Sequence, residues 1–282
     1  MIVFVNDTFT EEEKASISVF DRGFLYGDGC FETLRVYQGK PAFWQKHLNR
    51  LTRALEAFSI SFSVDPARLA EIATRLLKEN GRLEGILRIQ VTRGVGPRGY
   101  STVGSKNPSL IMSLHPLPRG IAETNPSWRL QTSALRIQRD TPLNAHKSSN
   151  KLLQVLAKQE AEQGGVDDVL LLTQDGFVSE TSSANLFWID GPTIKTPPES
   201  AGILPGITRE VILEICQSLG WPYAEELLPG GQLPQMNGVF LSQSVWEMIP
   251  VVSIDQRQLE PCRPFVSLQG ELRKRALESP FP

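Results

Sequence analysis

The sequence is poor in cysteine, in net charge and in long apolar runs. Its three cysteines, Cys30, Cys216 and Cys262, lie far apart in a chain of 282 residues. Such spacing gives neither the disulfide framework of a small secreted domain nor the paired ligands of a zinc site. We therefore expect reduced, mostly buried thiols and no bound metal.

Net charge is nearly absent as well. The chain has 29 Lys and Arg against 31 Asp and Glu, a formal net charge of −2. No broad basic surface can attract nucleic acid or anionic lipid, so we expect neither partner. No stretch is long and apolar enough to span a membrane, and the opening Met1–Asp7 differs from a cationic leader with a long apolar core. We expect a cytoplasmic protein.

The chain does contain material for a sizeable globular fold. Its 40% hydrophobic and 21% charged residues are typical of a packed core rather than of disorder. The length is about twice that of an average domain, which favours two domains over one large domain. Proline, glycine and polar residues concentrate between His115 and Ser127, as in a linker. We predict an N-terminal domain over 1–118, a linker over 119–128 and a C-terminal domain over 129–282.

The first half mixes helical and strand patterns. Apolar residues at helical spacing predict a helix through Leu48 to Phe58, and Asp65-Pro66 has the chemistry to start a second helix through Leu76. Short runs rich in β-branched and aromatic residues predict strands at 1–9, 31–37, 86–92 and 109–114. This half therefore reads as α+β.

The second half shows the same mixture. Apolar runs at 168–173 and 184–189 indicate strands, and the apolar residues from Leu152 to Leu156 indicate a helix. A further helix is expected with Thr208 as its N-cap and Gly220 as its stop. The whole chain is thus predicted to be α+β.

Three segments of the second half carry reactive groups. Lys147 lies among polar residues just before a predicted helix, and Glu180 precedes small polar residues and an apolar strand. In Gly202–Arg209, glycines, backbone N–H groups and the Thr208 hydroxyl gather at a helix N-terminus, a natural anion site. Each segment alone is commonplace: a solvated lysine, a turn acid and an ordinary helix start.

Together the segments supply what pyridoxal phosphate requires. This cofactor needs an amine that binds its aldehyde, a carboxylate that keeps its ring nitrogen protonated, and a nest for its phosphate. All three occur in order along the chain. We therefore predict a pyridoxal 5'-phosphate enzyme with a small-molecule substrate.

The chain resembles the class IV, or fold type IV, pyridoxal-phosphate enzymes. This group includes branched-chain aminotransferases, D-amino-acid aminotransferases and 4-amino-4-deoxychorismate lyases. The likeness covers nearly the whole chain, in the segments Phe20–Val36, His47–Leu51, Lys147, Glu180–Phe187 and Gly206–Thr208. It implies a two-domain α+β fold like that of D-amino-acid aminotransferases, and a homodimer.

The resemblance also implies roles for individual residues. Lys147 would be the catalytic residue, which binds the cofactor and then moves the proton at the substrate carbon. Glu180 would pair with the ring nitrogen. The phosphate would be bound by Arg50, Ile207, Thr208 and Ser244.

The segment Thr92–Ser101 carries the most information on substrate. It resembles the Arg-Gly-x-Gly-x-Arg-Gly-Tyr-Ser signature of aminodeoxychorismate lyases, and Arg98 offers a fork for a carboxylate. A mobile hairpin is the plain alternative for so glycine-rich a loop. The candidate substrate-binding residues are Arg98, Tyr100, Thr33 and Phe31.

Departures from the other family patterns narrow the choice. D-amino-acid aminotransferases have an Arg-x-His pair where this chain has Arg98-Gly99-Tyr100, and they tend to have tyrosine where Phe31 stands. Branched-chain enzymes have a tyrosine shortly after the lysine, whereas Asn150–Leu153 contains none. Against the lyase, Gln243 stands where some lyases have asparagine.

We predict a 4-amino-4-deoxychorismate lyase that makes 4-aminobenzoate and pyruvate on the folate route. The alternative is a class IV aminotransferase of D-amino acids, branched-chain amino acids or amines. A binding protein that kept the fold and lost catalysis is a third possibility, which the joint presence of Lys147, Glu180, Arg50 and Thr208 disfavours.

Overall fold

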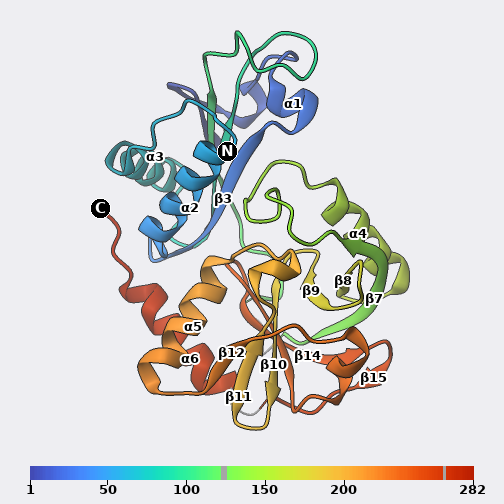
Figure 1. Ribbon diagram of the computed structural model, residues 1–282. Helices are drawn as coiled ribbons and strands as arrows, with labels where there is room; N and C mark the ends of the chain where they lie inside the picture. The colour runs from blue at the N-terminus through green and yellow to red at the C-terminus, as the bar shows by residue number, and fades with distance from the viewer. Residues whose placement is uncertain (122–125, 263–264) are drawn as a thin grey trace. The chain divides into compact units, whose positions relative to one another are not determined.

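The computed structural model describes residues 1–121, 126–262 and 265–282. By backbone contacts the chain divides into two compact units. Unit 1 comprises Met1–Pro118, His146–Asn150 and Ala276–Pro282, and unit 2 comprises Arg119–Ala145 and Lys151–Arg275. Figure 1 shows the elements of each unit.

These units differ from the sequence-based division in three places. Residues from Arg119 onward group with unit 2, whereas His146–Asn150 and Ala276–Pro282 group with unit 1. The part of the predicted linker at 122–125 lies outside the described residues, and a strand already begins at its last residue, Trp128. The division at 1–118, 119–128 and 129–282 stays a prediction.

Unit 1 is built on a six-stranded antiparallel sheet with the order β2-β1-β6-β5-β3-β4. Three α-helices accompany it within the described residues. The strands are β1 (Ile2–Val5), β2 (Thr8–Glu11), β3 (Gly29–Tyr37), β4 (Lys40–Pro41), β5 (Gly85–Thr92) and β6 (Ser109–His115). The helices are α1 (Arg22–Tyr26), α2 (Trp44–Ala57) and α3 (Pro66–Glu79), with a 3-10 turn at Glu12–Lys14.

The sequence explains how these helices form. Helix α2 buries Leu48, Leu51 and Leu55 and packs on β3. Helix α3 begins as predicted, because the Asp65 carboxylate accepts hydrogen bonds from two backbone N–H groups of the first turn. The strand predicted at 1–9 is two strands rather than one: Asn6 has φ 55°, so the chain turns there and β1 pairs with β2 as a hairpin.

Unit 2 contains a nine-stranded mixed sheet with the order β12-β11-β10-β13-β14-β7-β8-β9, and β15 pairs with β14. Because β9 pairs with β10 as well as with β8, six of these strands close into a ring. The strands are β7 (Trp128–Ile137), β8 (Asp168–Thr173), β9 (Val178–Thr181), β10 (Asn185–Asp190), β11 (Thr193–Thr196), β12 (Tyr223–Glu225), β13 (Val239–Gln243), β14 (Glu247–Ile254) and β15 (Arg257–Gln258). The helices are α4 (Leu152–Gly164), α5 (Ile207–Leu219) and α6 (Phe265–Glu278), of which the part from Ala276 onward groups with unit 1. Turns of 3-10 helix lie at Glu199–Ala201 and Gly230–Gln235.

Helix α5 differs from its prediction at one end. Its N-cap is Gly206 rather than Thr208, which lies inside the first turn. The N-cap needs extended backbone, and Gly206 has it at φ −71° and ψ 139°. The helix stops at Gly220 as predicted, where φ is 67°.

Cys30 and Cys216 are buried, and Cys262 is half-buried. Burial raises the pKa of the Cys216 thiol to about 11 and that of Cys262 to about 12, so both stay protonated at neutral pH. Across the described residues, no helix has the length and apolar character that a membrane crossing requires.

Candidate active site

Lys147 is positioned by pairing with a distant strand. Its carbonyl accepts a hydrogen bond from the Phe31 N–H of β3 at 3.0 Å, and the Ser149 N–H donates to Gly29 at 2.8 Å. The lysine therefore lies on an extended segment, and α4 starts five residues later at Leu152. Its ammonium nitrogen lies 4.7 Å from the centroid of the Phe31 ring, within cation–π range.

A buried charged triad lies on β3 and α2. The Glu32 carboxylate accepts hydrogen bonds from Arg50 Nε at 2.8 Å and Nη2 at 2.6 Å. His47 Nδ1 lies 2.7 Å from Oε2 of the same carboxylate. Because an ionised carboxylate only accepts, Nδ1 of a neutral His47 must carry its proton. Arg50 is thus held in a fixed orientation by two bonds to one carboxylate.

The triad shifts the proton affinities of its members. Burial would raise the pKa of Glu32, but the charge and hydrogen bonds of Arg50, with the bond from His47, lower it to about 2. Burial lowers the pKa of His47 despite the opposing effect of Glu32. At neutral pH the triad therefore consists of a carboxylate, a guanidinium and a neutral imidazole.

The predicted substrate residues lie in two parts of unit 1. Phe31 and Thr33 are on β3, where Thr33 pairs in register with Arg88 of β5. The Arg88 guanidinium lies 3.9 Å from the Phe31 ring centroid, so this ring is flanked by two cations. Arg98 and Tyr100 lie in the loop between β5 and β6, and both side chains are exposed.

Glu180 is held in unit 2 by a small hydrogen-bond network. Its Oε2 accepts from the Leu204 N–H at 3.0 Å and from Asn185 Nδ2 at 3.3 Å. Asn185 Nδ2 also donates to the Leu204 carbonyl at 2.8 Å. A Cβ at Gly206 would approach Asn185 Oδ1 to 2.1 Å, so a larger residue there would have to displace the Asn185 side chain. The network joins the carboxylate to the segment that precedes α5.

The N-terminus of α5 has the properties of an anion site. No side chain caps it, and Thr208 is buried in its first turn. The first N–H groups of a helix have no partner four residues back, and the helix dipole favours negative charge there. Ser244 lies in the turn between β13 and β14 and makes no hydrogen bond to the described residues. The buried Ser242 hydroxyl, opposite Asn185 in register, likewise has no described partner.

Comparison with known proteins identifies the family. The family model described as amino-transferase class IV matches residues 29–254. The chain belongs to the class IV aminotransferase family. The protein is therefore a pyridoxal-phosphate-dependent enzyme, and its α+β fold is that of fold type IV.

The relatives of this class IV enzyme differ in activity. It is 33% identical over 257 residues to a Methanocaldococcus jannaschii protein named "Putative branched-chain-amino-acid aminotransferase", covering 91% of this chain and 89% of the relative. It is 32% identical over 259 residues to the aminodeoxychorismate lyase of Bacillus subtilis (90% and 87%) and 30% identical over 258 residues to a D-alanine aminotransferase of Bacillus licheniformis (90% and 89%). The crystal structure of 4-amino-4-deoxychorismate lyase from Pseudomonas aeruginosa matches with a TM-score of 0.84 and 30% identity, over 96% of this chain and 98% of that one.

The residues present in each unit suit pyridoxal phosphate. Unit 1 offers the Lys147 amine and the buried Arg50 guanidinium. Unit 2 offers a carboxylate, Glu180, that already accepts N–H donors, together with an uncapped helix N-terminus and a buried hydroxyl at Ser242 that has no partner among the described residues. An amine, a carboxylate and an anion nest are the groups that this cofactor requires.

Sequence reasoning missed Glu32, His47, Asn185 and Arg88. A signal existed for Glu32 and His47, because both lie in segments that carry the family resemblance. Asn185 also follows Glu180 in a quoted segment, yet only the fold shows that it bridges Glu180 and Leu204. For Arg88 an alternating strand gave no hint of its place over Phe31.

Proposed function

We propose that this class IV enzyme is a 4-amino-4-deoxychorismate lyase that forms 4-aminobenzoate and pyruvate. The observation that carries the proposal is the exposed turn Arg98-Gly99-Tyr100, which presents a guanidinium and lacks the histidine of D-amino-acid aminotransferases. Phe31 supports it, since the ring beside the Lys147 amine has no hydroxyl. The similarity to two proteins named as lyases agrees with this choice.

The chain's own groups account for the steps of this reaction. Pyridoxal phosphate, when bound, supplies a sink for the electrons of the substrate carbon that bears the amino group. Lys147 would bind the cofactor aldehyde and then take the proton from that carbon. The C–O bond that joins the enolpyruvyl group to the ring would then break, and the enolpyruvate that leaves with the electron pair of this bond would take up a proton on carbon to become pyruvate. Glu180 would keep the proton on the ring nitrogen.

The remaining groups would bind and orient. Arg50, fixed by Glu32, would bind the phosphate together with the N–H groups of Ile207 and Thr208 and the Ser244 hydroxyl. Arg98 would bind a substrate carboxylate through its planar fork, with Tyr100, Thr33 and Phe31 as pocket residues.

An aminotransferase acting on D-amino acids, branched-chain amino acids or amines is the second candidate. The relatives named as branched-chain and D-alanine aminotransferases favour it, at 33% and 30% identity. Both reactions begin with the same proton removal by a lysine and differ only in their later steps. The residues of the proton-transfer step therefore serve either reaction.

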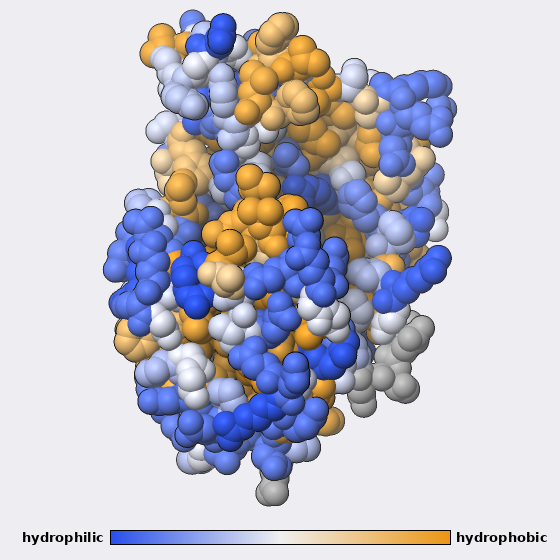
Figure 2. Space-filling model, turned by 90° about the vertical axis from the view of Figure 1, so that its right-hand side faces the viewer, coloured by the Kyte–Doolittle hydropathy of each residue, from blue (hydrophilic) through white to orange (hydrophobic). Residues whose placement is uncertain are grey.

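We further propose a cytoplasmic homodimer that serves folate synthesis. Exposed apolar side chains of unit 1 concentrate around α1 and in the Arg98 loop, and apolar surface gathers in the upper part of Figure 2. Contiguous exposed apolar surface is typical of an association site. The residues concerned are Val19, Phe20, Phe24, Leu25, Val95, Tyr100 and Val103.

A comparison of substrates tests the choice of reaction. The purified enzyme is incubated with aminodeoxychorismate, and separately with D-alanine or L-leucine plus 2-oxoglutarate. Release of 4-aminobenzoate well above glutamate formation supports the lyase. The reverse order would replace it with the aminotransferase.

A further inference from the structure

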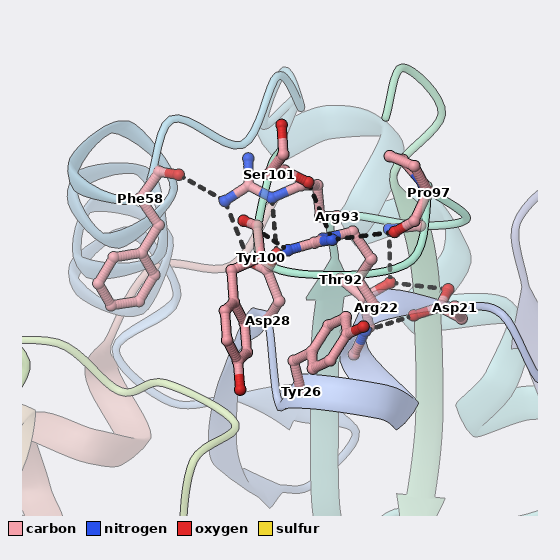
Figure 3. Close-up of polar contacts among 12 residues, drawn as sticks. Asp21, Arg22, Tyr26, Asp28, Phe58, Thr92, Arg93, Pro97, Tyr100 and Ser101 are labelled. Carbon is pink, nitrogen blue, oxygen red and sulfur yellow. Dashed lines mark hydrogen bonds and ion pairs between the residues drawn. The ribbon is translucent and has the colours of Figure 1, made fainter. Parts of the chain in front are cut away.

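Arg22, at the start of α1, lies buried beneath the turn that carries Arg98 (Figure 3). Its Nη1 donates to the carbonyl oxygens of Gly99 at 2.8 Å and Ser101 at 3.1 Å and faces that of Pro97 at 3.5 Å. Its Nη2 donates to the Tyr100 carbonyl at 3.3 Å. One guanidinium thus gathers the carbonyls on both sides of Arg98.

The position of Arg22 is itself fixed. The backbone N–H of Arg22 donates a hydrogen bond to the Gly94 carbonyl at 2.9 Å. The preceding Asp21 caps α1 by accepting from the Gly23 N–H, and it also accepts from the hydroxyls of Thr92 at 2.9 Å and Ser109 at 2.7 Å. These bonds tie the start of α1 to the ends of β5 and β6, the two strands that the loop connects.

The turn is shaped to fit this arginine. A Cβ at Gly96 would lie 2.8 Å from Arg22 Cδ and 2.2 Å from Ser105 Oγ, so any larger residue there would have to displace both the arginine stem and the serine hydroxyl. The Gly99 N–H donates to the Tyr26 hydroxyl at 3.0 Å, and the Tyr26 ring lies 5.7 Å from that of Tyr100. Arg98, in contrast, is exposed and makes no hydrogen bond to the described residues.

Asp28 pairs with Arg22 and also with a second buried arginine, Arg93. Arg22 Nε donates to its Oδ2 at 2.8 Å, and Arg93 donates to both of its oxygens at 2.8 and 3.0 Å. Burial raises the pKa of Asp28, but the hydrogen bonds from Arg93 and Arg22 outweigh it, so that the pKa is lowered. Arg93 does not reach the turn and donates instead to the carbonyls of Phe58 and Ser59, at 2.7 and 2.8 Å.

We propose that Arg22 is a positioning residue that fixes the 97–101 turn and thereby aims Arg98 at a carboxylate of the substrate. We call the hydrogen bonds from Arg22 to the carbonyls of the 97–101 turn the Arg22 clamp. The role of Arg98 rests on the function proposed above, whereas the clamp rests on the bonds of Arg22 alone. A planar guanidinium with five N–H donors can serve several carbonyls and one carboxylate together. A lysine ammonium in its place can keep the positive charge beside Asp28, but it cannot also make the several hydrogen bonds to the carbonyls of the turn.

A pair of matched substitutions separates the clamp from the ion pair. Arg22→Lys and Arg93→Lys both keep a cation beside Asp28, and only the first removes donors from the turn. Hydrogen–deuterium exchange of the holoenzyme is measured by mass spectrometry in a peptide covering 96–105. We expect amide exchange in Arg22→Lys to be about tenfold faster than in the wild type, and unchanged in Arg93→Lys. Equal exchange in all three proteins, or equal acceleration in both variants, would overturn the clamp.

Steady-state kinetics with aminodeoxychorismate then test whether Arg22 positions Arg98 to bind a substrate carboxylate. Arg22→Lys should raise KM about tenfold with kcat within about threefold of the wild type, because binding rather than proton transfer is disturbed. In an Arg98→Ala background the same substitution should raise KM no further. Faster exchange with unchanged KM would overturn the positioning role. If Arg98→Ala alone leaves KM unchanged, the proposed carboxylate role of Arg98 fails, and the exchange result still decides the clamp.

Discussion

Arg50 binds the Glu32 carboxylate through two hydrogen bonds inside unit 1, with its Nε and Nη2 at 2.8 and 2.6 Å from the two oxygens. Both side chains are almost wholly buried, and His47 completes the triad. A buried ion pair of this kind adds little net stability over an apolar pair, but breaking it is costly. The single geometry that it imposes on Arg50 suits a residue that binds a phosphate.

The triad predicts a distinct acid response. The pKa of Glu32 is lowered in the folded state from 4.5 to about 2, so below about pH 4.5 the unfolded chain binds more protons than the native one. This carboxylate thus contributes stability above that pH, about 3 kcal/mol, which is lost as the pH falls toward 2. Glu32→Gln should lower the unfolding free energy at pH 7 by about 3–5 kcal/mol and flatten its acid dependence.

Urea unfolding at several pH values measures this effect. The exposed Glu56→Gln on the same helix as Arg50 serves as control and should behave like the wild type. Parallel acid profiles for the wild type and Glu32→Gln would refute the assignment.

Lys147→Ala should abolish the cofactor linkage and leave the fold intact, since the lysine side chain is only half-buried. Activity should fall by about 10²–10⁴-fold with loss of the proton-transfer group. Borohydride reduction and subsequent peptide mapping locate the linkage, with Lys151→Ala as control. Label on Lys151 instead of Lys147 would show that the wrong lysine has been assigned.

Glu180→Gln should reduce kcat by about 10²–10³-fold while the cofactor is retained, because an amide cannot stabilise a protonated ring nitrogen as a carboxylate does. The substituted side chain can still accept the Leu204 N–H through its oxygen. Turnover and cofactor absorbance are compared with those of the exposed Glu199→Gln. A kcat equal to that of the control places the essential carboxylate elsewhere.

The proposed homodimer predicts complementation between inactive chains if the Arg98 loop serves the neighbouring chain's site. Mixing Arg98→Ala with Lys147→Ala should then restore up to about one intact site in each heterodimer of two sites, because the other site collects both defects. Activity is measured after unfolding and refolding the mixture. A mixed dimer without recovered activity, or a fully active monomer, contradicts a shared site.

Local sequence patterns predicted α2, α3, α4 and α5, because the causes of these helices are local, whereas α1 and α6 were not predicted. The spacing of Leu48, Leu51 and Leu55 marks the buried face of α2, and the Asp65 carboxylate caps α3 within its own first turn. At α5 the pattern placed the N-cap two residues late, since Thr208 has the typical capping side chain whereas Gly206 has the required backbone.

Local patterns could not predict which distant segments of the chain form hydrogen bonds with one another. Nothing near Lys147 shows that its segment bridges to β3 more than a hundred residues earlier. The turn at Asn6 that makes β1 and β2 a hairpin depends on a left-handed backbone, which asparagine tolerates but does not require. Likewise, the four carbonyls gathered by Arg22 become visible only once the loop is folded.

Product stoichiometry without any 2-oxo acid acceptor tests most directly whether the enzyme is the proposed lyase. The purified holoenzyme is supplied with aminodeoxychorismate alone, and 4-aminobenzoate and pyruvate are quantified over many turnovers. We predict that both products accumulate in equal amounts, and that Lys147→Ala forms them about 10²–10⁴-fold more slowly. Failure to form 4-aminobenzoate would contradict the lyase. A reaction that stops after one turnover until a 2-oxo acid is added would contradict it as well and identify an aminotransferase.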